Sequence, residues 1–107
     1  MDAGELLFAA HALGLPLRAD AQRLITPDGL PLALEREAVR LRSVLVPLLA
    51  LTVAQLCHGM TADEREAFEE RAAILETDGG YPRELAERAA VWWTRTQAQP
   101  APTARAA

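Results

Sequence analysis

The chain has 107 residues, half of them hydrophobic, which excludes an intrinsically disordered protein but leaves little room for an enclosed catalytic cleft beside a single core. All eleven basic residues are arginine, and fifteen acidic residues give a formal net charge of -4. Neither half of the sequence has the basic excess that phosphate contacts require, so direct nucleic-acid binding is not expected.

The first predicted element is a short helix over residues 2–13. At 100° per residue, one stripe of this helix collects four apolar side chains: Leu6, Leu7, Ala10 and Leu13. Gly14 is the type of residue that ends a helix. This spacing predicts a helix that faces a core.

The next segment, residues 15–26, predicts a β-hairpin. Leu15 and Leu17 alternate with Pro16 and Arg18, residues 19–22 form the turn, and residues 22–26 return as a second strand. Because side chains alternate along a strand, Arg23 and Ile25 face away from the helices if Leu24 and Thr26 face them. The turn has no glycine.

Residues 31–57 have a helical pattern that we expect to divide in two. Pro31 suits the first turn of a helix, whereas Pro47 lacks the amide hydrogen that a helix interior needs. The pattern therefore predicts a kink or break between Arg42 and Pro47. The segment that follows, residues 44–57, is almost entirely apolar and must be covered, either by the C-terminal half or by a second subunit.

This apolar segment is fourteen residues long, whereas a membrane span needs about 20. The N-terminus also lacks the basic and apolar regions of a secretory signal, so we expect a cytoplasmic protein with no membrane contact. Cys57 is the only cysteine, which excludes a disulfide within the chain, and it is expected to be a small buried apolar residue.

Residues 60–95 predict an antiparallel helical hairpin. Thr61 and Glu64 have the spacing of a capping box, the Asp-Gly-Gly sequence at 78–80 ends the first helix, and Pro82 opens the second. The facing stripes are expected to be Phe68, Ala72 and Leu75 against Leu85, Ala89 and either Trp92 or Trp93. Residues 96–107, rich in proline and alanine, predict a disordered tail.

The first half of the chain, about residues 4–50, resembles the TubC N-terminal docking domain. The resemblance is carried by apolar and turn positions: Leu6, Leu7, Gly14, Leu15, Leu17, Arg23, Leu24, Leu30, Leu34, Leu45, Val46, Leu48 and Leu49. It implies a homodimeric helix–hairpin–helix–helix module whose hairpin receives a short partner peptide. Part of the second half is similar to short segments of bacterial mobile-element and replication-linked proteins of unclear role.

The expected fold is therefore α+β and mostly α. Residues 1–59 form the docking-like module, residues 60–95 the helical hairpin and residues 96–107 the tail.

The polar residues do not predict catalysis, a metal site or a cofactor site. The carboxylates from Asp63 to Asp78 are expected to cover a solvated helix surface. His11 and His58 are far apart in sequence, and adjacent residues such as Cys57 and His58 point about 100° apart on a helix. We expect a protein without enzymatic activity.

The candidate interaction residues fall into two groups. The residues expected to bind a partner are Arg18, Arg23, Ile25 and Trp92. The arginines would favour an acidic peptide or a free carboxylate. The alternatives are that the C-terminal half covers Ile25 and that the tryptophan outside the core stripe merely lies on the surface. The residues expected to mediate self-association are Val44, Leu45, Leu48, Leu49 and Leu56.

The sequence thus predicts a homodimeric docking or adaptor module that receives a protein segment at its hairpin. The alternative function is a small accessory regulator of a replication or mobile-element machine, contacting nucleic acid or its enzymes through residues 61–95.

Overall fold

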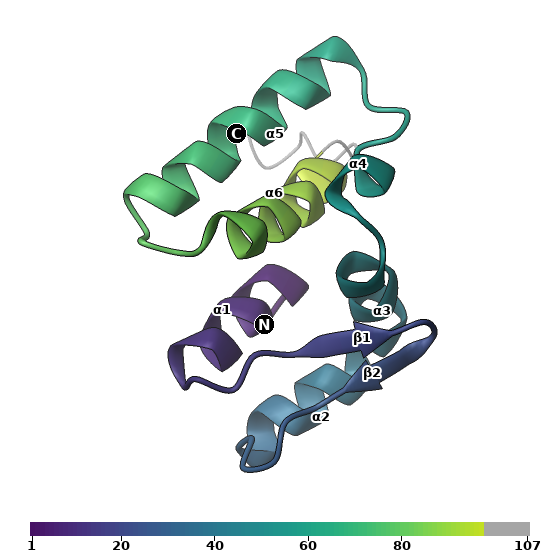
Figure 1. Ribbon diagram of the computed structural model, residues 1–107, viewed down its shortest axis with the longest axis vertical. Coiled ribbons are helices and arrows are strands. Elements are labelled where there is room, and N and C mark those ends of the chain that lie inside the picture. The colour runs from purple at the N-terminus through teal and green to yellow at the C-terminus, as the bar shows by residue number, and fades with distance from the viewer. Residues whose placement is uncertain (98–107) are drawn as a thin grey trace, which may run out of the picture. The chain divides into compact units, whose positions relative to one another are not determined.

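The computed structural model describes residues 1–97, which form a mostly helical chain with one β-hairpin (Figure 1). The chain divides into two compact units between His58 and Gly59. The first unit contains α1 to α4 and the hairpin, and the second contains α5 and α6. This arrangement confirms the expected α+β, mostly α fold.

The first helix, α1, spans Ala3–Ala12, close to the expected range. Asp2 and Glu5 form a capping box, in which the Asp2 carboxylate accepts from the Glu5 amide at 2.8 Å and the Glu5 carboxylate accepts from the Asp2 amide at 2.7 Å. Leu6, Leu7 and Ala10 are buried as expected. The expectation for Leu13 is wrong, because it follows the helix as the C-cap and is 52% exposed.

The hairpin consists of β1, Arg18–Asp20, and β2, Arg23–Ile25, paired antiparallel. The first strand begins later than expected, so Leu17 precedes it and is buried. The turn contains only residues 21 and 22, and Ala21 has a φ of 54°. A positive φ at the first position of a two-residue turn is usually found at glycine, and because alanine occupies this position the turn signal in the sequence is weak.

The expected helix break is misplaced, because α2 spans Leu32–Arg40 and α3 spans Arg42–Ala50. The two helices separate at Leu41, before the predicted interval, and Pro47 lies inside α3. Residues 44–57 are also not one helix. The chain becomes extended at Leu51, and Thr52 then caps a four-residue helix, α4, Val53–Leu56.

The core of the first unit combines α1, the hairpin and the two central helices. Its α3 contacts both strands and α2, and α1 also contacts α2. The buried residues of this unit are mostly small or aliphatic: Ala3, Leu6, Leu7, Ala10, Leu17, Leu30, Ala38, Leu45, Leu48 and Cys57. The expectation that Cys57 is buried is confirmed.

The second unit is the predicted helical pair, with α5 spanning Ala62–Thr77 and α6 spanning Arg83–Gln97. Their contact is the most extensive one between two elements, and Figure 1 shows them side by side. Thr61 and Glu64 form the expected capping box. Residues 96 and 97 belong to α6, and the remainder of the expected tail lies outside the described residues.

Phe68 and Ala72 form the buried stripe of α5, with Leu75 half-buried beside them, as expected. On α6 the buried stripe is broader than predicted, because it includes Ala86 and Ala90 as well as Ala89. These three side chains are small. Val91 and Thr94 are buried on α6 as well, so three of the five buried residues described on this helix are alanines, which allow another helix backbone to approach closely.

Candidate functional site

The outer face of the hairpin brings together the partner-binding residues predicted in the first unit. The strand register pairs Arg18 with Ile25 and Asp20 with Arg23. Directly opposed residues of an antiparallel pair share one face, so all four side chains lie on the same side of the sheet. All four are exposed, whereas Ala19 and Leu24 on the other face are partly covered. The predicted orientation of Arg23 and Ile25 is therefore confirmed.

A shallow hollow lies at the Ile25 end of this face. Its volume is about 230 Å³, and it is lined by Gly14, Leu15, Pro16, Arg18, Ile25 and Pro27. The Ile25 side chain is 45% exposed, which is unusual for a β-branched aliphatic residue in a strand. The two prolines have no amide hydrogen, and they are apolar members of this wall. Such a hollow suits one apolar side chain beside a charged group that Arg18 can bind.

The charges of the outer face are mixed. Within residues 1–97, Arg18, Asp20 and Arg23 have no ion-pair partner closer than 4.0 Å. Arg18 stands beside Ile25 and the hollow, whereas Arg23 stands opposite Asp20. Sequence reasoning missed Asp20, although the strand alternation that placed Arg23 outward also places Asp20 outward. The positive end of the face is therefore the Arg18 end.

The hairpin also has unpaired strand edges. Among the described residues the sheet contains only β1 and β2, so each strand has one edge without a neighbouring strand. An extended peptide can add to such an edge through main-chain hydrogen bonds, with alternate side chains entering pockets. The hollow lined by Arg18 and Ile25 lies on this same hairpin.

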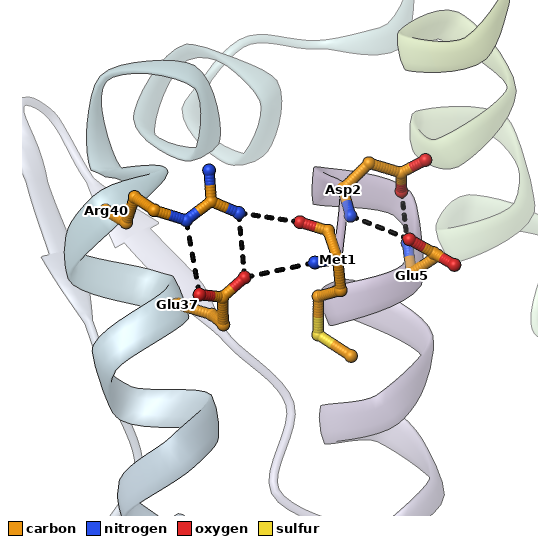
Figure 2. Close-up of polar contacts among 5 residues, drawn as sticks. All are labelled: Met1, Asp2, Glu5, Glu37 and Arg40. Carbon is orange, nitrogen blue, oxygen red and sulfur yellow. Dashed lines mark hydrogen bonds and ion pairs between the residues drawn. The ribbon is translucent and has the colours of Figure 1, made fainter.

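A second polar cluster fixes the N-terminus against α2 (Figure 2). The Arg40 guanidinium donates to both Glu37 carboxylate oxygens, at 2.7 and 3.2 Å, and to the carbonyl oxygen of Met1 at 2.8 Å. The Met1 ammonium lies 3.3 Å from Oε1 of Glu37. Hydrogen bonds from Arg40 and then from the Met1 ammonium lower the pKa of Glu37 to about 2.

The Glu37 cluster predicts a specific loss of stability in acid. A depressed pKa means that the folded state favours the carboxylate, so this contribution is complete above the ordinary pKa of 4.5 and is lost as the pH falls towards about 2. We expect Glu37→Gln to make the free energy of unfolding of the first unit less dependent on pH between these values. Urea unfolding at a series of acidic pH values measures this. Glu35→Gln, on the exposed side of the same helix, is the matched control; an equal change in both variants would contradict the assignment.

The second unit has a groove between its two helices. It has a volume of about 470 Å³ and is lined by Ala67, Glu70, Arg71, Ile74, Leu75 and Trp93. Ile74 is 50% exposed. Trp93 lines this groove, whereas Trp92, the tryptophan expected from the sequence to bind a partner, does not line it. Both residues are half-buried, and the Trp92 carbonyl accepts a hydrogen bond from Thr96 at 2.8 Å. The sequence could not choose between the two tryptophans, because the pairing of α5 with α6 decides which one faces the groove.

The predicted self-association residues are divided between core and surface. Leu45 is fully buried and Leu48 is 4% exposed, so neither can reach a second copy without opening the unit. Val44, Leu49 and Leu56 are half-buried. The most exposed aliphatic residues of α2 and α3 are instead Leu32 and Val39, whose exposed fractions are 60% and 69%.

The histidine, cysteine and acidic side chains are dispersed over the described part of the chain. In residues 1–97, no three histidine, cysteine or acidic side chains come together as a metal-binding group. Cys57 is buried, and His58 lies on a separate surface hollow with Ala54 and Gln55. None of the helices over these residues has the length and apolarity that crossing a membrane requires.

Comparisons with known proteins identify no relative. No protein-family model, curated protein or solved structure matches this chain.

Proposed function

We propose that this chain is a non-enzymatic docking module, functioning as a homodimer, whose β-hairpin receives an extended segment of a partner protein. One observation carries the proposal: the strand register places Arg18 and Ile25 side by side on the outer face, at the mouth of a hollow and on a sheet with unpaired edges. This combination supplies main-chain hydrogen bonds, an apolar pocket and a positive charge in one place.

The charges of the face define the partner segment further. An aliphatic side chain enters the hollow beside Ile25, and a carboxylate next to it pairs with the Arg18 guanidinium. Towards the turn, the opposed Asp20 and Arg23 make the face nearly neutral. The best segment is therefore acidic only at the Arg18 end, either through an Asp or Glu residue or through its own C-terminal carboxylate.

The test is a selection of peptides from a displayed random decapeptide library on the full chain, followed by affinity measurements on synthetic copies. We expect the selected peptides to place an aliphatic residue next to a carboxylate. Arg18→Glu is expected to weaken their binding about tenfold or more, because it replaces attraction by repulsion. Ile25→Asp is expected to weaken peptide binding as well, because it replaces an apolar wall of the hollow by a charged one.

Arg42→Glu is the matched control, since Arg42 is an exposed arginine of the same unit that lies outside this face. Circular dichroism verifies that each variant folds. Failure to select any peptide, or equal binding by the parent chain and Arg18→Glu, would refute docking at the hairpin.

A further inference from the structure

The solvent-facing side of α2 carries aliphatic residues that do not pack into the core of its own unit. Leu32 and Val39 are seven residues apart, so they lie on the same side of the helix, and they are 60% and 69% exposed. Glu35 and Arg36 stand between them and are also exposed. Ala38, about 100° around the helix from Val39, is fully buried. The exposed side is thus an aliphatic–charged–aliphatic stripe about 10 Å long.

A matching stripe lies along the groove of the second unit. Ala67 and Ile74 on α5 are also seven residues apart, with Glu70 and Arg71 between them. Trp93 from α6 forms the groove wall beside these residues. The α5 stripe is therefore also apolar at both ends and charged in the middle, and it has the same length as the α2 stripe.

The two stripes correspond when the helices run in opposite directions. Leu32 then faces Ile74, and Val39 faces Ala67, where the small alanine leaves space beside the Trp93 ring. From Leu32 to Arg36 is four residues, and from Arg36 to Val39 is three. When α5 is read from its C-terminal end, the same spacing of four and then three residues separates Ile74, Glu70 and Ala67.

The charges agree with the same alignment. It places Arg36 opposite Glu70, and it places Glu35 opposite Arg71. Within residues 1–97, neither Arg36 nor Glu70 makes an ion pair, and both side chains are exposed. An antiparallel contact therefore covers the aliphatic residues and joins opposite charges in a single register.

From this correspondence we infer that the chain self-associates by packing α2 of one copy antiparallel against α5 of a second copy, in the groove walled by Trp93. In a closed dimer each copy contributes both surfaces, so the contact forms twice. This inference specifies the homodimer of the proposed function. It uses no residue of the hairpin face, so a failure of the peptide test and a failure of the test below are separate results.

The test is the molar mass of the full chain, measured by sedimentation equilibrium from micromolar to submillimolar concentrations. We expect twice the chain mass of 11.6 kDa at the upper end. Arg36→Glu and Glu70→Arg are each expected to raise the dimer dissociation constant about tenfold or more, because each variant opposes two like charges. Combining them restores opposite charges and is expected to restore dimerisation.

Val39→Ser is an independent variant, which we expect to weaken the dimer by removing an aliphatic contact without changing charge. Asp28→Arg reverses an exposed charge outside the two stripes and should leave the dimer intact. A monomer at every concentration would overturn the inference and leave the groove to another protein. A dimer insensitive to both single reversals, or assemblies that grow beyond two copies, would overturn it as well.

Discussion

Replacing Leu45 by alanine is expected to lower the free energy of unfolding of the first unit by about 2–5 kcal/mol. Leu45 is fully buried, on a helix that contacts both strands and α2. Truncation removes apolar contacts and leaves a cavity that these elements cannot easily fill. In a unit of this size such a loss is a large part of the total stability.

Urea unfolding followed by circular dichroism measures the loss, and the chain provides an internal reference. Both tryptophans lie on α6, so their fluorescence reports the second unit separately. Val46→Ala is the matched control, because Val46 is half-buried beside an open groove, and its truncation should cost clearly less.

The same variant separates a core role for Leu45 from the self-association role that the sequence predicted. If a residue acts only between copies, its truncation lowers the molar mass of the chain in solution. The same truncation leaves the free energy of unfolding of the isolated chain nearly unchanged. We expect the opposite for Leu45→Ala. A loss of dimer without a loss of unit stability would contradict the placement of Leu45 in the core.

Local signals in the sequence were sufficient to predict the ends of α5 in the second unit. Thr61, Glu64 and the Asp-Gly-Gly sequence mark both ends of α5, because capping and left-handed glycine conformations are set by neighbouring residues. Strand alternation likewise gave the outward direction of Arg23 and Ile25. These predictions needed no knowledge of the tertiary structure.

Features that depend on pairing could not be predicted in the same way. The register of the hairpin, and not its composition, places Arg18 beside Ile25 and Asp20 beside Arg23. The pairing of α5 with α6 makes Trp93 the groove residue. The correspondence between α2 and α5 required knowing which side of each helix is already covered.

The apolar segment 44–57 shows a further limit. Its composition correctly indicated burial for Leu45 and Leu48, but it concealed the interruption at Leu51 and Thr52. Thr52 and Gln55 form a capping box that the sequence spacing contains, although the surrounding aliphatic residues favoured one continuous helix. Of residues 44–57, however, only Leu45, Leu48 and Cys57 are buried, and Leu51 is 38% exposed, so the expectation of a fully covered segment was also too broad.

Pro47→Ala is expected to raise the free energy of unfolding of the first unit by about 2 kcal/mol. A proline inside a helix costs about 3 kcal/mol relative to alanine, and part of this is offset because proline also restricts the unfolded chain. Pro47 is exposed and lies in the interior of α3, so its replacement loses little packing. An alanine amide at this position can donate to the Ser43 carbonyl oxygen, which proline cannot bind.

Pro31→Ala is the matched control, because Pro31 precedes the first turn of α2 and its missing amide hydrogen has no helical acceptor there. Its carbonyl accepts from the Leu34 and Glu35 amides in either variant. We therefore expect no gain from Pro31→Ala, and a small loss from the greater freedom of the unfolded chain. Urea unfolding of both variants measures the difference. If Pro47→Ala brings no more stability than Pro31→Ala, α3 does not run through residue 47 as a regular helix, and the break that the sequence predicted next to this proline is the correct description.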